Sequence, residues 1–271
     1  MKEKSSNEKI TIYLAIFFIL FLIVVLVLYF LGIIGKGPAT VDVVLDKDIM
    51  ITYSKDKWSK VLPKNYSNYN WQKFNVYEEG KKKGKYSLYI SDEKFYLFEE
   101  KNNQRISITT IEQSTYLGGR KKSTFVEFKK EEITDDDTEY INSVLIKNGV
   151  SKNDLNNYIR GYKVKSDFDN DNQQEEMYVL YNVFSDEVVD TAYSLLFIKD
   201  NNNTNFIYKN IVSNKNAFSQ CAATPLGLIK IDGVDSVQII TQCSYYSYSN
   251  NNEYGVYQNR HNTYELLLYI K

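Results

Sequence analysis

The chain has 271 residues and a formal net charge of −1 at pH 7, because 33 basic residues face 34 acidic ones. This balance excludes the overall basic field by which nucleic-acid-binding proteins hold phosphates, so no nucleic-acid partner is expected. The 24 tyrosines, together with many Asn, Lys and Ile residues, suit exposed β-sheet surfaces and the codon usage of an AT-rich bacterial genome.

The first predicted element is a helix over residues 10–34, a stretch without a charged side chain. At 1.5 Å rise per residue, such a helix spans the ~30 Å hydrocarbon core of a bilayer, which predicts a transmembrane helix. The apolar region of a cleaved signal peptide is shorter, about 7–15 residues, and is followed by a small-x-small cleavage site. Residues 35–40 contain no clean site of this kind, so a retained anchor is favoured over a cleaved signal.

Lysine residues are distributed unequally around this stretch. Lys2, Lys4 and Lys9 precede it, whereas only Lys36 follows it closely. The positive-inside rule therefore assigns residues 1–9 to a cytoplasmic tail and the large C-terminal part to the extracytoplasmic side. The expected localisation is the cell membrane, crossed in a single pass.

Residues 40–130 form the first predicted β region. Short runs of β-branched and aromatic residues alternate there with Gly, Asn and Lys, which is typical of a meander. The runs lie at residues 49–53, 74–77, 86–90, 95–98, 106–109 and 125–128.

Residues 131–159 predict a pair of short helices. The segment Thr134–Asp137 supplies capping oxygens and negative charge at a helix N-terminus, and apolar residues then follow at helical spacing. Lys147–Gly149 is a typical helix stop. Ser151–Asp154 has the spacing of a capping box and predicts the start of a second helix, which would reach residue 159.

Residues 160–271 form the second predicted β region and contain a weak internal repeat. The pattern of residues 162–181 returns at 228–241, and each half continues with two more predicted strands. Two four-stranded units cannot close a propeller, which needs at least about four blades, so we expect a sandwich or an extended meander. The predicted fold class is mainly β (α+β), with one N-terminal transmembrane helix followed by a β-rich ectodomain with a short helical pair.

One motif carries metal chemistry. We define the acidic loop as residues 167–175, in which Asp167, Asp169, Asp171 and Glu175 follow the spacing D-x-D-x-D-x-x-x-E. Alternate carboxylates aim hard oxygen ligands at one point, and Ca²⁺ takes about six to eight oxygens in such a flexible arrangement. The alternative interpretation is a solvated turn that binds no metal, because Asp and Asn gather in turns for backbone reasons alone.

The acidic loop resembles the strand-flanked aspartate loops of the FG-GAP and VCBS repeats, which occur in integrin-like propellers and bacterial surface proteins. The resemblance covers this loop with its flanking strands and, more weakly, residues 228–241. Asn172 stands where the family pattern has Gly, a position that Asn tolerates. The resemblance implies a structural Ca²⁺ ion held by the side chains of Asp167, Asp169, Asp171 and Glu175 and by the carbonyl of Gln173.

The second copy of the repeat departs from this pattern. Its matching positions are Lys230, Asp232, Val234 and Gln238. Lys230 puts a cation where the resemblance requires a ligand, so no second metal site is expected.

Cys221 and Cys243 are the two cysteines of the chain. An even pair in an extracytoplasmic domain is what a disulfide requires. If the strands at 226–231 and 237–243 pair antiparallel, the two cysteines lie at the same end of a hairpin. A pair of buried free thiols is the alternative.

Three further clusters fit two interpretations each. The basic segments 80–85 and 119–122 suit contact with anionic polymers or lipid headgroups outside the cell, or else solvated hairpin tips. The tyrosine-rich segment 245–248 suits a stacking platform for sugars, or else an ordinary strand surface or edge loop.

The expected function is a membrane-anchored extracytoplasmic binding or structural module of a bacterial envelope, with an envelope polymer or a membrane protein as its partner. An enzyme is not expected, because the single histidine, His261, lies in a polar turn and no nucleophile elbow or zinc spacing is present. The alternatives are a carbohydrate-active or peptidoglycan-processing enzyme that uses acidic residues, and an accessory subunit of a membrane complex.

Overall fold

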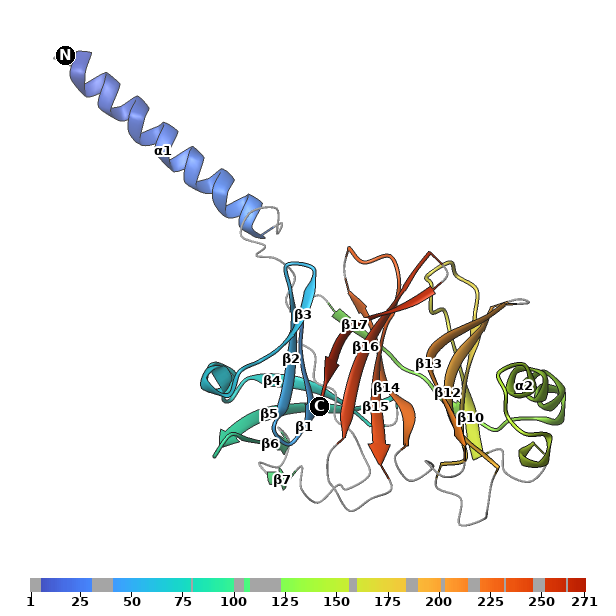
Figure 1. The fold of residues 1–271 in the computed structure, drawn as a ribbon. Coiled ribbons are helices and arrows are strands. Elements are labelled where there is room, and N and C mark those ends of the chain that lie inside the picture. The colour runs from blue at the N-terminus through green and yellow to red at the C-terminus, as the bar shows by residue number, and fades with distance from the viewer. Residues whose placement is uncertain are drawn as a thin grey trace. The chain divides into compact units, whose positions relative to one another are not determined.

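The computed structural model of the protein describes residues 6–30, 41–78, 80–99, 105–107, 123–155, 160–183, 190–200, 203–213, 220–231, 233–245, 252–261 and 263–271. The chain forms two compact units, Met1–Ala39 and Thr40–Lys271, and each unit is described by itself (Figure 1).

The first unit contains helix α1 (Ser6–Phe30), whose side chains from Tyr13 to Leu26 are nearly all exposed. The helix begins in the polar segment before the predicted apolar stretch, and residues 31–34 of that stretch lie outside the described residues. Within the described part of the chain, no helix is long and apolar enough to cross a membrane, so the structure does not support the predicted transmembrane helix.

The second unit consists mainly of antiparallel strands, which confirms the predicted mainly β class. Two smaller sheets come first in the chain. One contains β1 (Val41–Asp46), β2 (Ile49–Ser54) and β3 (Lys57–Lys60), and the other contains β4 (Lys73–Glu78), β5 (Lys81–Ser91), β6 (Lys94–Glu99) and β7 (Arg105–Ser107). A short 3-10 helix, η1 (Pro63–Tyr69), connects them.

Two larger sheets follow, each built around a four-stranded meander. The strands of the first meander are β10 (Arg160–Ser166), β11 (Glu175–Tyr181), β12 (Thr191–Asp200) and β13 (Asn203–Ser213), and those of the second are β14 (Cys221–Ile231), β15 (Gln238–Tyr245), β16 (Glu253–Arg260) and β17 (Thr263–Ile270). The meanders occupy the two halves of the repeat noted in the sequence, and both have the same strand order.

The sheets stack in layers, each pair separated by a hydrophobic core (Figure 1). The β1–β3 sheet packs between the β4–β7 sheet and the β14–β17 sheet, and the latter packs against the β10–β13 sheet. The β10–β13 sheet is covered on both faces, by the β14–β17 sheet and by a helical segment, so its strand β12 is buried almost continuously rather than alternately.

The last strands of the predicted β region 40–130 pair with strands of the two larger sheets. Its last strand, β8 (Ser123–Val126), pairs with β14, and the next strand, β9 (Lys130–Glu131), pairs with β10. The segment from 123 to 131 therefore contributes one edge strand to each of the two larger sheets.

Helix α2 (Asp135–Lys147) covers the outer face of the β10–β13 sheet (Figure 1). The expected capping oxygens and negative charge lie at its start, where Thr134 and Asp137 form a capping box that was not predicted from the sequence. Gly149 follows the end of α2 with a φ of +90°. In the described part of the second predicted helix the chain forms a 3-10 turn, η3 (Lys152–Asp154), and the carboxylate of Asp154 accepts hydrogen bonds from the backbone N–H groups of Asp190 and Thr191. Residues 156–159 lie outside the described residues.

Asp137 also joins α2 to the sheet beneath it. Its carboxylate accepts hydrogen bonds from the Lys163 ammonium at 2.8 Å and the Tyr178 hydroxyl at 2.7 Å. Burial acts to raise the pKa of Asp137, but the hydrogen bonds from Lys163, Thr134 and Tyr178 outweigh it and hold this pKa well below its usual range. The helix is therefore attached by a buried ion pair as well as by its apolar face.

Candidate metal centre

The acidic loop connects β10 to β11 at one end of the first meander. The two strands pair up to its base, where Ser166 lies opposite Glu175. Asn170 and Asn172 take the left-handed backbone conformation, with φ of +67° and +71°. Asn tolerates this region better than most side chains, so the substitution of Asn172 for the Gly of the family pattern costs little.

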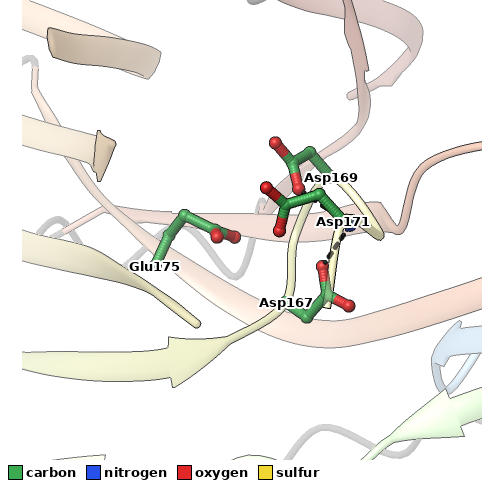
Figure 2. A group of neighbouring side chains, drawn as sticks. All are labelled: Asp167, Asp169, Asp171 and Glu175. Atoms are coloured by element: carbon green, nitrogen blue, oxygen red, sulfur yellow. Dashed lines mark hydrogen bonds between the residues drawn. The ribbon is translucent and has the colours of Figure 1, made fainter. Parts of the chain in front are cut away.

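The structure brings the four predicted carboxylates together. One ligand oxygen from each of Asp167, Asp169, Asp171 and Glu175 lies within 4.8 Å of the others. Figure 2 shows the three aspartates gathered in the loop, with the Glu175 side chain reaching toward them from the start of β11. An acidic cluster that could hold a metal ion is thus present.

Backbone hydrogen bonds shape the loop around these side chains. The Asp167 carboxylate accepts from the N–H of Asp171 at 3.0 Å and from the N–H of Asn172 at 3.1 Å. Asp171 in turn accepts from the N–H of Gln173 at 2.7 Å. The side-chain amide of Gln173 also donates to Asp171, at 3.1 Å, so the fifth predicted ligand lies beside the cluster.

Phe168 fixes the loop to the core. Its ring is fully buried between the two larger sheets, and its carbonyl accepts a hydrogen bond from the N–H of Val237 in the second meander. Its own N–H donates to Glu175 at 2.8 Å, and Glu175 is only 8% exposed. One ligand of the cluster is therefore held rigidly at the core, while the aspartates lie nearer to solvent.

The carboxylates repel one another. Burial raises the pKa of Glu175 to about 7, and the charges of Asp169, Asp171 and Asp167 add to the rise, while the N–H of Phe168 opposes it. Burial and then the charge of Asp171 likewise raise the pKa of Asp169. Among the described residues, no lysine or arginine forms an ion pair with any of the four.

The donor set fits Ca²⁺ better than a transition metal. All four side chains offer hard carboxylate oxygens, with no sulfur or imidazole nitrogen, and Ca²⁺ takes about six to eight oxygens with flexible geometry. The nearby cation is Lys230, whose ammonium donates to the side-chain carbonyl of Asn170 instead of to a carboxylate. Lys230 is the residue that the sequence identified as the break in the second repeat, and Asp232 of that repeat lies outside the described residues.

Cys221 and Cys243 lie on adjacent strands, as the expected hairpin of β14 and β15 requires. Ala223 is opposite Cys243, and Cys221 is opposite Tyr245. The two Cα atoms are 5.3 Å apart, and the structure joins the sulfur atoms in a buried disulfide. This separation is within the usual range for disulfides.

The remaining residues that the sequence offered as candidates for a functional site lie away from the acidic loop or outside the described residues. His261 is exposed in the tight turn between β16 and β17. A hollow lined partly by Asp46, Asp48 and Glu253 offers carboxylates for the enzyme alternative. However, hydrogen bonds from Tyr269, Tyr245 and Lys271 outweigh burial and lower the pKa of Glu253, which suits an ion-pair partner rather than a general acid.

The basic segment 119–122 and residues 246–248 of the tyrosine-rich segment lie outside the described residues.

In comparisons with protein families, with curated proteins and with solved structures, no match to this chain was found. The likeness to FG-GAP and VCBS loops therefore depends on the residues of the acidic loop themselves.

Proposed function

We propose that the chain is a single-pass protein of a bacterial envelope, in which the N-terminal helix holds a β-rich binding or structural module at the outer face of the membrane. One observation carries the proposal. Of the seventeen large hydrophobic side chains that are exposed in the described residues, twelve lie on α1 between Tyr13 and Leu26. Such a concentration of exposed apolar surface requires an apolar environment, and a bilayer supplies one.

The acidic loop adds a structural role for Ca²⁺. The proposed ion would be held by Asp167, Asp169, Asp171 and Glu175, with Gln173 as the further oxygen donor. Bound there, the cation would neutralise the repulsion between the carboxylates and attach the β10–β11 connection to the core through Phe168 and Glu175.

The same proposal takes Cys221 and Cys243 to form a disulfide in the mature protein, as an extracytoplasmic location allows.

Protease added to intact protoplasts tests the topology. With an epitope tag at the N-terminus, the proposal expects loss of residues 40–271 and protection of the tag, because only the tail would lie outside. A tail that is protected from protease contradicts the orientation. A tail that is shed into the medium, beginning near Ala39, would identify the apolar stretch as a cleaved signal.

A further inference from the structure

The sheet of β4 to β7 has two different faces (Figure 1). One face packs in the core, through residues such as Phe74, Leu88 and Leu97. The opposite face carries a group of aromatic rings that are not part of any core. We define this aromatic face by its rings and by the positions on β4, β5 and β6 that share their side of the sheet: Trp71, Lys73, Asn75, Lys85, Ser87, Tyr89, Ser91, Lys94, Tyr96 and Phe98.

The rings of the aromatic face contact one another. The ring centroid of Trp71 lies 5.0 Å from that of Tyr89 and 5.5 Å from that of Phe98, and Tyr89 lies 6.3 Å from Tyr96. Tyr89, Tyr96 and Phe98 are half-buried, whereas 58% of Trp71 is exposed. The rings therefore form one continuous platform that is open at the tryptophan.

The position of Trp71 on the aromatic face is unfavourable for its backbone and for its side chain. Its backbone has a φ of +61°, a conformation that is unfavourable for a bulky side chain, and its indole is left in water. The conformation is maintained because the N–H of Trp71 donates to the carbonyl of Leu88 and the N–H of Leu88 donates to the carbonyl of Gln72. Strain kept at an exposed aromatic residue indicates a binding role rather than a packing role.

The charged residues of the aromatic face are all positive. Lys73 and Lys85 lie on one side of the rings and Lys94 on the other, and all three are exposed. The positions that define the face include no Asp or Glu, although the whole chain has a net charge of −1. Among the described acids next to these positions, Asp92 and Glu93 form the turn between β5 and β6, and Glu99 lies opposite Tyr86 on the other side of the sheet.

We propose that the aromatic face binds an anionic polysaccharide. Sugar rings present C–H groups that stack on the electron-rich faces of aromatic rings, and the exposed ammonium groups of Lys85 and Lys94 complement acidic groups along the polymer. Ser87 supplies a hydroxyl between the two kinds of contact. The ligand class rests on the proposed function, because a module outside the membrane meets envelope polysaccharides instead of intracellular nucleic acid.

Titration of the full-length protein in detergent micelles with polygalacturonate tests the proposal. The chain has two tryptophans, and Trp58 is only 7% exposed, so a change in emission on binding reports on Trp71. Binding should weaken as salt rises, and neutral dextran should bind much more weakly.

Matched variants separate the contributions of ring and charge. Trp71→Gly removes the indole at a backbone conformation that Gly prefers, so the fold is kept, and affinity for polygalacturonate should fall about tenfold or more. Lys85→Glu should weaken binding several-fold. Lys57→Glu makes the same charge change on an exposed residue of another sheet and should bind like the parent protein.

Three results would overturn the proposal: no binding of polygalacturonate by the parent protein, unchanged binding by Trp71→Gly, or tighter binding of a single-stranded oligothymidylate. The last would identify the face as a surface for nucleic acid. None of these results alters the protease test of topology, so failure here removes the ligand assignment and leaves the anchored module intact.

Discussion

Glu175 differs from the three aspartates of the acidic loop in its surroundings. It is buried against Phe168, whereas Asp171 is exposed and Asp167 and Asp169 are partly exposed. A buried carboxylate with a raised pKa is costly to ionise beside other acids, and a bound divalent cation removes that cost. The arrangement therefore favours a single metal that lies between a buried ligand at the core and more exposed ligands at the surface.

Calcium should stabilise the folded protein. Extracellular modules bind Ca²⁺ with a Kd of about 10⁻⁴–10⁻³ M, so millimolar Ca²⁺ should add about 1 kcal/mol and raise the Tm by roughly 2–4 °C. Mg²⁺ should do less, because it demands a tighter octahedral shell. Thermal unfolding with and without a chelator measures the shift.

Two variants assign this calcium effect to the loop. Asp169→Ala removes a ligand from the middle of the cluster and should abolish the shift in Tm. Asp235→Ala, at an exposed position between β14 and β15, should keep it. A melting curve of the parent protein that responds neither to Ca²⁺ nor to chelator would make the loop an ordinary acidic turn.

At the scale of elements, α2 depends on a residue with two roles. Asp137 closes the capping box at the helix start, where the sequence indicates capping oxygens and negative charge, and its carboxylate also accepts hydrogen bonds from Lys163 and Tyr178 on the sheet. The sequence pattern indicated a helix start at this segment, because the residues that cap a helix are close to one another in the chain. The second role requires β10 and β11 to lie under the helix, so no local pattern could reveal it.

Asp137→Ala should lower the free energy of unfolding by roughly 3 kcal/mol, because it removes the closer of the two carboxylates that pair with the buried Lys163 ammonium and leaves only Glu176. Asp136→Ala, in the same turn but exposed, should cost only about 0.5 kcal/mol through the helix dipole. Urea unfolding measures both variants. Equal losses would contradict a buried ion pair as the attachment of α2.

The same ion pair predicts a dependence on pH. The folded-state pKa of Asp137 lies below its usual value, so its contribution to stability is present above about pH 4 and is lost as the pH falls further. Asp137→Ala should therefore be less sensitive to acid than the parent protein, relative to its own stability at neutral pH.

At the scale of the whole molecule, the layers of the second unit bring distant segments together. The Trp58 indole on β3 donates a hydrogen bond to the buried side chain of Gln238 on β15, and Tyr254 on β16 donates to Asp46 on β1 at 2.7 Å. These two hydrogen bonds connect the β1–β3 sheet to the β14–β17 sheet. A disulfide between β14 and β15 also stabilises the second unit.

The Cys221–Cys243 disulfide closes a loop with a sequence separation of 22. In the chain-entropy model a loop of this size contributes about 3 kcal/mol, so reduction should lower the free energy of unfolding by about that amount. Mass spectrometry of unreduced peptides from membrane-derived protein should find the two cysteines linked. Free thiols that can be alkylated in that material would contradict the prediction, and the double variant Cys221→Ala/Cys243→Ala should not respond to reductant.

The sequence by itself determined features that depend on neighbouring residues. These are most of the strand runs, the start of α2 at Thr134–Asp137, the repeated meanders and the carboxylate register of the acidic loop. Runs at 74–77, 86–90 and 95–98 became β4, β5 and β6 because β-branched and aromatic side chains favour extended backbone wherever they pack. The strand Val41–Asp46 was not predicted, and its Asp42 is buried with the apolar residues around it.

Only the tertiary structure decided which surfaces meet. It assigned β8 and β9 to different sheets, covered both faces of the central sheets, and left the aromatic face of β4–β7 outside every core. It also did not support the transmembrane helix that hydropathy alone predicted. The physical reason is that backbone propensity and capping act over a few residues. Burial, in contrast, depends on contacts between segments far apart in the chain, and no local pattern encodes which segments those are.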